Sequence, residues 1–163
     1  MADEHIATYL NDHLAGSVVA LELLELLEAA HAGTPLQGFA TELLADVAAD
    51  RQELEALMGK LNIVQSRARK ATAWMTEKFT ELKLRLDDPA GGALRLLEAL
   101  EAVAIGIDGK KALWLALAAA SEETPRLRIA DYGRLTKRAE DQRHRVEVVR
   151  VQAAKAAFRE ARG

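Results

Sequence analysis

The three prolines of this chain constrain its fold more than any other feature, because each follows directly on a residue that favours the N-cap of a helix. The pairs are Thr34–Pro35, Asp88–Pro89 and Thr124–Pro125. Proline interrupts the interior of a helix but fits its first turn, where an amide hydrogen is not needed. Three helices are therefore predicted to begin at these prolines.

Other signals mark where helices end. Gly33 occupies the position of a C-terminal glycine cap, and Gln37 is spaced to complete a capping box with Thr34. The stretch "LNIVQS" at residues 61–66 predicts another interruption, since Asn tolerates helix ends and Ile and Val prefer extended backbone. The chain is thus predicted to form one domain, residues 1–163, with helices at about 4–31, 35–61, 66–86, 90–121 and 125–162.

The composition agrees with an all-α protein. Hydrophobic residues make up 50% of the chain and aromatic residues only 4%, with Ala and Leu, two strong helix formers, dominating. The absence of cysteine excludes disulfides, thiolate catalysis and iron–sulfur clusters. No stretch is apolar enough to cross a bilayer, and the acidic N-terminus lacks the features of a signal peptide. We therefore expect a cytoplasmic location and no membrane partner.

Long helices joined by short turns pack as antiparallel pairs. Helices 4–31 and 35–61 are expected to form one hairpin, and helices 90–121 and 125–162 a second, with helix 66–86 connecting the two. In this order the chain resembles the ferritin-like superfamily, specifically its small bacterial members with a helical crossover. The resemblance implies an antiparallel four-helix bundle with an additional crossover helix. A five-helix up-and-down array is the simpler alternative.

Ferritin-like bundles hold two metal ions with inward carboxylates from four helices and a Glu-x-x-His motif on two of them. The stretch "AEDQRHRVE" at residues 139–147 places Asp141 three residues before His144. At about 100° per residue, however, His144 lies about 170° from the centre of the apolar stripe of its helix. Helix 35–61 contains no histidine. We therefore predict no metal and no cofactor, and ferroxidase, oxygenase and iron-storage activities are not carried over.

The C-terminal part of the chain is basic. Residues 126–163 hold 11 Lys and Arg against 5 Asp and Glu, although the whole chain has a net charge of −3. These cations are spread around the helix, and no aromatic residues lie nearby to stack on bases. A solvated face with intrahelical ion pairs is favoured over a nucleic-acid partner. No glycine-rich phosphate loop or nucleophile elbow is present, so an enzyme is not favoured either.

Two of the predicted helices are apolar on the side opposite the core. The last helix carries Val148, Val151 and Phe158 beside His144, and the first carries Val19, Leu23, Leu26 and Ala30. A helix that is apolar on two faces is normally covered on both. Helix 66–86 is wide enough to cover one of these stripes, which leaves the other for a partner surface. A homodimer is therefore predicted.

Four polar residues fall on helix faces that are otherwise apolar: His13, Asp50, Lys111 and Tyr132. Counting from the predicted turns places them at one height along the bundle. A buried carboxylate needs a cation, so Asp50 is predicted to pair with Lys111 or with a protonated His13, and the Tyr132 hydroxyl to complete the hydrogen bonding. Such a layer is either a structural network that fixes helix alignment or a ligand or catalytic site.

The sequence thus favours a non-enzymatic helical bundle without a standard di-metal centre, acting through self-association or a protein partner. The family resemblance implies a small stress-associated scaffold. The alternative is a bundle that binds a metal or a small ligand at an atypical site around His13 and Asp50.

Overall fold

The computed structural model describes residues 2–66 and 92–159, and these residues form α-helices, a short 3-10 helix and no strand. The elements are α1 (Ala2–Ala30), α2 (Pro35–Lys60), α4 (Gly92–Glu123), the 3-10 helix η2 (Pro125–Leu127) and α5 (Tyr132–Ala157). The prediction of an all-α bundle is confirmed. The predicted helix 66–86 lies outside the described residues, apart from Ser66. None of the described helices is both long and apolar enough to cross a membrane.

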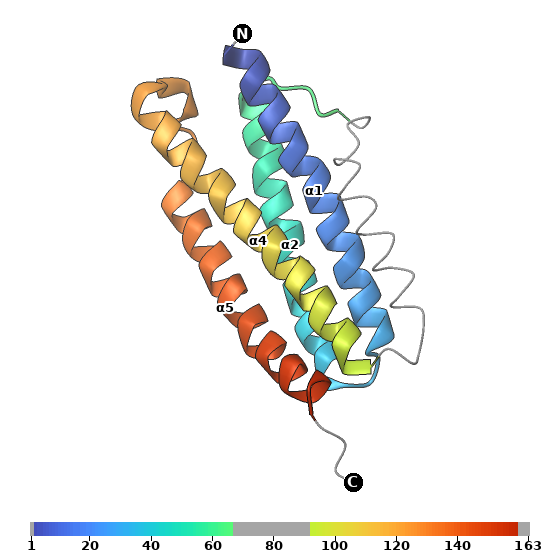
Figure 1. Cartoon of the computed structure of the whole chain (residues 1–163). Helices are drawn as coiled ribbons and strands as arrows, with labels where there is room; N and C mark the ends of the chain where they lie inside the picture. The colour runs from blue at the N-terminus through green and yellow to red at the C-terminus, as the bar shows by residue number, and fades with distance from the viewer. Residues whose placement is uncertain (1, 67–91, 160–163) are drawn as a thin grey trace.

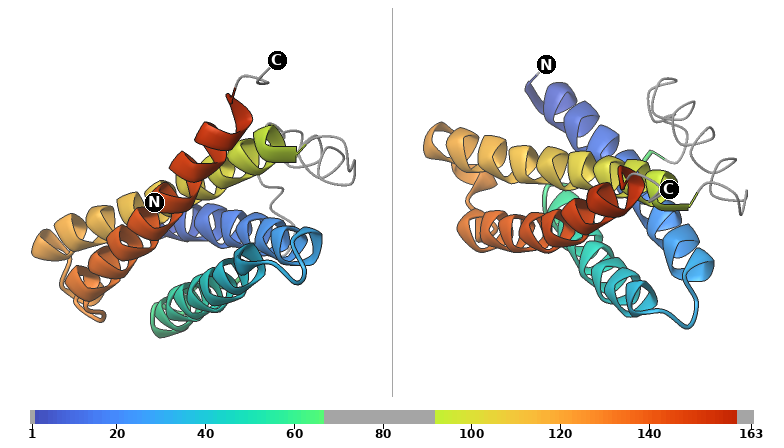
Figure 2. Two further views of the ribbon diagram at one scale, coloured as in Figure 1. Left: turned by 90° about the horizontal axis from the view of Figure 1, so that it is seen from below. Right: turned by 60° about the horizontal axis from the view of Figure 1, so that its bottom comes forward.

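The four helices form two antiparallel hairpins, α1–α2 and α4–α5 (Figure 1). The turn between α1 and α2 lies at one end of the bundle, and the turn between α4 and α5 lies at the other. As a result α2 and α4 run in the same direction. Within the bundle α1 packs against both α2 and α4, and the two hairpins cross at an angle (Figure 2).

The turn between α1 and α2 follows the predicted glycine signal. Gly33 has a φ of 77°, a left-handed conformation that glycine adopts without steric cost. Its amide donates a 2.8 Å hydrogen bond to Gln37 Oε1. The predicted capping box between Thr34 and Gln37 does not form, because the amide and the hydroxyl of Thr34 both donate to the His31 carbonyl, at 3.1 and 2.7 Å, and Gln37 bonds to Gly33 instead.

The end of α2 is a Schellman motif centred on Asn62, which has a φ of 56°. The amide of Asn62 donates to the Gly59 carbonyl at 3.1 Å, and that of Ile63 donates to the Met58 carbonyl at 2.9 Å. Asparagine tolerates this left-handed geometry better than most residues. The predicted interruption at residues 61–66 is therefore confirmed.

The chain that leaves α2 is tied to α1 by Asn11, whose residue surface is only 5% exposed. The Asn11 amide nitrogen donates to the Val64 carbonyl at 3.2 Å, and its oxygen accepts from the Ser66 amide at 2.6 Å. A buried side-chain amide with both ends bonded stabilises the fold, whereas the same group without partners would cost free energy. Asn11 thus fixes the path of the segment after α2.

The last helix begins later than predicted. Pro125 opens only the 3-10 helix η2, and α5 begins at Tyr132. The Asp131 carboxylate accepts a 2.9 Å hydrogen bond from the Arg134 amide, which makes Asp131 the N-cap of α5. The sequence therefore contains two start signals, six residues apart, and the second one starts the long helix.

The hydrophobic core consists of two clusters along the bundle axis. The first lies toward the α1–α2 turn and includes Leu24, Leu43, Leu100 and Val146. The second lies toward the α4–α5 turn and includes Leu10, Met58, Trp114 and Leu135. Each of these side chains is at most 1% exposed. Burying a side chain of this size contributes about 1.5–3 kcal/mol, so both clusters hold the hairpins together.

Candidate functional site

Charged and polar side chains interrupt the core where its two clusters meet. On α2, Asp50 lies between Val47 of the first cluster and Leu54 of the second, and it is 2% exposed. On α4, Lys110 lies in the same way between Ile107 and Leu113. The sequence therefore places a carboxylate and an ammonium group at the same height of the bundle.

These two residues form a cluster with Gln142 and Arg138 of α5, which we call the polar cluster. Lys110 Nζ contacts both Asp50 Oδ2 and Gln142 Oε1. Gln142 Nε2 donates to Asp50 Oδ2 at 2.8 Å. Arg138 Nη2 lies 3.0 Å from Asp50 Oδ1, an ion pair without hydrogen-bond alignment, since that oxygen accepts no hydrogen bond from the described residues. The polar cluster joins α2, α4 and α5.

The charges of Asp50 and Lys110 are matched inside the bundle. Burial lowers the pKa of Lys110, and the carboxylate of Asp50 opposes this effect by favouring the protonated ammonium. An unpaired charge in this position would be costly, because the interior cannot replace the water that it loses. Asp50, Lys110 and Gln142 therefore depend on one another for their burial.

Arginines of α5 extend the polar cluster toward the surface along α2. Arg134 pairs with Glu53 at 2.8 Å, and Arg145 pairs with Asp46. Arg138, between them, also lies 3.8 Å from the carboxylate of Glu53. Part of the basic surplus of the C-terminal segment is thus matched by acidic residues of α2, across about 80 to 100 residues of sequence. The predicted ion pairs within the last helix therefore account for only part of its charge pairing.

The predicted pairing of Asp50 with Lys111 is wrong. Lys110, one residue earlier, is the lysine that reaches Asp50. Lys111 instead pairs with Glu140 at 2.8 Å on the outer side of α4 and α5, where the two side chains are 35% and 45% exposed. Successive residues of a helix lie about 100° apart, so only one of the two lysines can point inward.

Tyr132 and His13 do not join the polar cluster either. Tyr132 is buried in the second core cluster, where its hydroxyl donates to the Leu127 carbonyl at 2.6 Å and holds η2 against α5. The His13 ring is half-buried and stacks edge-on against Tyr9, with 4.7 Å between ring centroids. Burial lowers the pKa of His13. No hydrogen bond or ion pair joins His13 to Asp50 in the described part of the chain.

The arrangement of the polar cluster suits a structural role. Its ammonium, amide and carboxylate groups are turned toward one another. Within residues 2–66 and 92–159, no group of three or more Asp, Glu or His residues is placed to hold a metal ion. The polar cluster thus links α2 of the first hairpin to α4 and α5 of the second.

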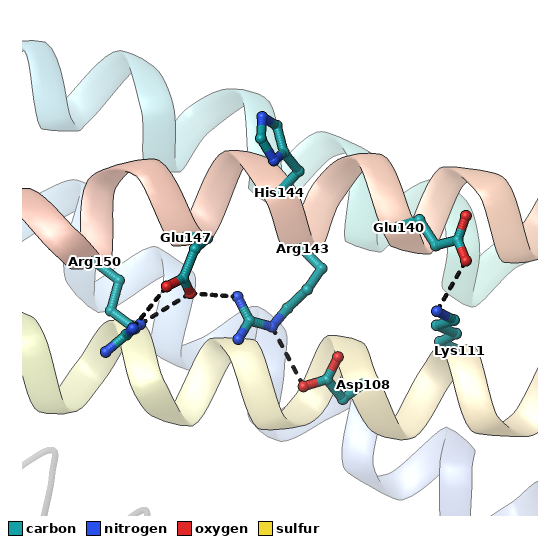
Figure 3. A pocket seen from close by; sticks show the side chains of 7 residues that line it. All are labelled: Asp108, Lys111, Glu140, Arg143, His144, Glu147 and Arg150. Carbon is teal, nitrogen blue, oxygen red and sulfur yellow. Dashed lines mark hydrogen bonds and ion pairs between the residues drawn. The ribbon is translucent and has the colours of Figure 1, made fainter.

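An open groove of about 460 Å³ runs over the outside of α4 and α5 (Figure 3). Arg143 Nε lies 3.3 Å from Asp108 Oδ2, and Arg143 Nη1 lies 2.8 Å from Glu147 Oε2. Arg150 Nη2 lies 2.6 Å from Glu147 Oε1, and Arg150 Nη1 lies 3.2 Å from Glu101 Oε1. Hydrogen bonds from Arg150 and Arg143 lower the pKa of Glu147 to about 2. The charges of the groove neutralise one another, so it offers no surplus charge for binding an ion.

The carboxylates and histidine of the stretch "AEDQRHRVE" lie outside the bundle. Glu140, Asp141 and His144 are all exposed. Figure 3 shows the His144 ring pointing away from α4, and Asp141 pairs with Lys137 one turn earlier at 2.5 Å. The predicted outward direction of this motif is confirmed, because Asp141 and His144 are both exposed and do not line the interior of the bundle.

The outer apolar stripe predicted for the last helix is exposed. The stripe predicted for the first helix is exposed only in part, since Val19 and Leu26 are half-buried and Ala30 is exposed. Val148, Val151 and Phe158 are 54%, 36% and 70% exposed. On α1, Leu23 is only 3% exposed and belongs to the first core cluster. The prediction for Leu23 is wrong because α1 packs against two helices, α2 and α4, and so buries a wide face.

The fold and the polar cluster define the class of this protein as an all-α bundle of two helical hairpins joined through a buried ion pair. No protein-family model matches the chain, and neither a curated protein nor a solved structure shows significant similarity to it. The resemblance to ferritin-like proteins stays a prediction.

Proposed function

We propose that this protein is a non-enzymatic helical scaffold that acts by self-association as a homodimer. Its contact surface includes the outer row of α5, by which we mean Val148, Val151 and Phe158. In such a dimer these exposed apolar side chains are covered by the second copy, and no reactive group is needed.

The exposure of the outer row is the main support for the proposed homodimer. The inner face of α5 is already filled, since Ala139 and Val146 are fully buried, so the outer row contributes nothing to the core. Phe158 follows Val151 by two helical turns, which puts both on one side of α5. Large apolar side chains gathered on one exposed face indicate a surface that is covered by another molecule.

The polar cluster supports a structural role in the same scaffold. A bundle that presents a fixed surface needs its hairpins held in one alignment, and a buried ion pair favours one alignment over others. In the ligand-binding alternative, Asp50 would have to exchange Lys110 and Gln142 for a ligand. Both side chains contact its Oδ2 atom, which makes the structural role the better supported of the two.

We further propose that the architecture is ferritin-like. In that topology the second and third bundle helices run in the same direction and a crossover segment joins them. The parallel course of α2 and α4, with the two hairpin turns at opposite ends, supports this proposal. An experimental structure of the whole chain tests it, because the ferritin-like arrangement requires residues 66–86 to cross along the outside of the four-helix bundle, whereas a five-helix up-and-down array would include them as a bundle helix.

Replacing apolar residues of the outer row by glutamate tests the proposed dimer. Light scattering at micromolar concentration is expected to give the wild-type chain twice its mass of 17.8 kDa. Phe158→Glu and Val151→Glu are expected to return the mass to that of a monomer. Val64→Glu is the matched control, because Val64 is 85% exposed and lies on the segment after α2. A dimer that survives both outer-row changes would show that this surface is not the contact.

A different protein as the partner of the outer row is the second reading of the same surface. It predicts a monomer whose outer row is protected only when that partner is present. The cytoplasmic location expected from the sequence stays a prediction, which fractionation of cells that express the chain tests.

A further inference from the structure

The outer surfaces of α4 and α5 together form one face of the bundle, with α1 and α2 behind it (Figure 3). Oppositely charged residues lie across this face at three heights. Lys111 pairs with Glu140 at 2.8 Å, Asp108 pairs with Arg143 at 3.3 Å, and Glu101 pairs with Arg150 at 3.2 Å. In each pair one member comes from α4 and the other from α5, so these contacts fix which residues of the two helices share a height.

Exposed apolar residues lie along the α4 side of this face. Leu94, Ile105 and Leu115 are 48%, 66% and 50% exposed. Leu94 precedes Glu101 by seven residues, and Leu115 follows Lys111 by four, so each lies on the same side of α4 as its charged neighbour. Both helices therefore contribute exposed apolar side chains to this face.

The apolar residues of the two helices also match in height. Leu94 lies seven residues before Glu101, and Phe158 lies eight residues after Arg150. Because α4 and α5 are antiparallel, both positions are displaced from the Glu101–Arg150 pair by about 10–12 Å in the same direction. Leu94 and Phe158 thus share the end of the face nearest the α1–α2 turn.

We infer that the dimer forms when two copies of this face pack together around a two-fold axis parallel to the helices, so that α4 of each copy lies on α5 of the other. This inference rests on the self-association proposed above and adds the geometry of the contact. A rotation about such an axis exchanges the two helices but leaves every height unchanged. It is therefore a closed, self-complementary arrangement.

The charges of the face favour this arrangement. Under the two-fold rotation, Glu101 of one copy meets Arg150 of the other, and Lys111 meets Glu140. Each acidic residue then lies near a basic residue of both copies, and like charges are not opposed. Complementary charge of this kind selects one orientation of a complex over others. Leu94 of one copy meets Phe158 of the other at the end of the face.

The face is large enough for a stable dimer. At 1.5 Å per residue, α5 is about 39 Å long, and two adjacent helices are about 20 Å wide. Their product is about 800 Å² per copy, which is the size of a standard specific interface. The outer row of α5 alone would supply only a narrow contact, so including α4 accounts better for a lasting association.

Cysteine cross-linking tests this geometry cleanly, because the natural chain contains no cysteine. Two single variants, Leu94→Cys and Phe158→Cys, are exchanged into mixed dimers and oxidised gently. A disulfide between the two different chains is expected, and neither variant alone is expected to cross-link, since identical residues lie diagonally across the axis. Val64→Cys serves as the control for random collision, and Val151→Cys reports direct packing of α5 on α5.

The outcomes separate this inference from the proposed function. A mixed Leu94–Phe158 cross-link, without cross-linking of either variant by itself, supports the parallel two-fold axis. Efficient cross-linking of Val151→Cys alone, or a dimer in which the mixed cross-link never forms, overturns this geometry and leaves self-association standing. A chain that remains at 17.8 kDa in the same experiment removes both.

Discussion

The Asp50 carboxylate is the most sensitive single group of the polar cluster. Asp50→Ala removes the only acidic residue of that cluster and leaves the ammonium of Lys110 with the amide oxygen of Gln142 but without a carboxylate. Lys110 has a side-chain exposure of only 15%, so it cannot return to water without moving α4. Breaking a buried ion pair by removing one partner costs about 3–5 kcal/mol, and we expect a loss of about 3 kcal/mol or more.

The reverse change is expected to cost less. After Lys110→Met, Asp50 keeps the ion pair with Arg138 at 3.0 Å and the hydrogen bond from Gln142 at 2.8 Å. Asp50→Ala combined with Lys110→Met removes both charges, so the double variant is expected to recover much of the loss seen in Asp50→Ala. Lys111→Met is the matched control, since Lys111 pairs only at the surface and such pairs contribute little.

Urea denaturation followed by circular dichroism measures these differences as free energies of unfolding. A domain of this size is stabilised by about 5–15 kcal/mol, so a loss of about 3 kcal/mol shifts the midpoint clearly. The double-mutant cycle isolates the coupling between the two residues. If the double variant is no more stable than Asp50→Ala, or if Lys111→Met restores stability as well as Lys110→Met does, Asp50 and Lys110 are not partners.

Three further predictions follow from individual residues. Burial lowers the pKa of His13 below the usual 6.5, so the unfolded chain takes up a proton at a higher pH than the folded chain does. The free energy of unfolding therefore falls as the pH drops below 6.5. His13→Gln is expected to remove this contribution to the pH dependence of the melting temperature. Carbon-13 NMR is expected to show the Glu147 carboxylate titrating at about pH 2, and Arg150→Gln to raise that pKa toward 4.5; an unchanged value would show that Arg150 does not hold it. Asn11→Ala leaves the Ser66 amide and the Val64 carbonyl without their side-chain partner. Thermal denaturation is therefore expected to show a loss of about 1–2 kcal/mol in the free energy of unfolding. An unchanged stability would mean that water replaces the side chain.

Helix boundaries were predictable where the signal is local. Gly33 and Asn62 occupy left-handed backbone positions that few residues tolerate, so their effect can be read from the neighbouring residues. Pro35 begins α2 as expected. The start of α5 is ambiguous in the sequence because Pro125 and Asp131 both signal a helix start, and only the second signal begins the long helix.

The choice between Lys110 and Lys111 shows how a narrow pattern fails. Ile107 and Trp114 are compatible with either lysine, because both spacings of three and four residues keep to one side of a helix. The buried face of α4 is wider and also contains Val103, Leu113 and Leu117. The centre of this full face lies closer to Lys110 than to Lys111, so counting all the apolar positions of α4 favours the correct residue.

Contacts between distant segments were not accessible from the sequence. In the sequence, Asn11 resembles any other polar residue of a helix. Its side chain nevertheless forms hydrogen bonds with Val64 and Ser66, which lie 53 and 55 residues later in the chain. Gln142 is buried on α5, and nothing within its own helix marks it as a partner of Asp50. Its contact with Asp50 depends on how the two hairpins cross, which helix periodicity does not determine.

The mass of the unmodified chain in solution tests the central claim most directly. Sedimentation equilibrium from about 1 to 100 µM, a range that spans the dissociation constants of many specific complexes, is expected to show a reversible monomer–dimer equilibrium approaching twice 17.8 kDa. Raising the salt concentration is expected to weaken the association, because charged pairs line the proposed contact. A single species of 17.8 kDa across the whole range would contradict the account.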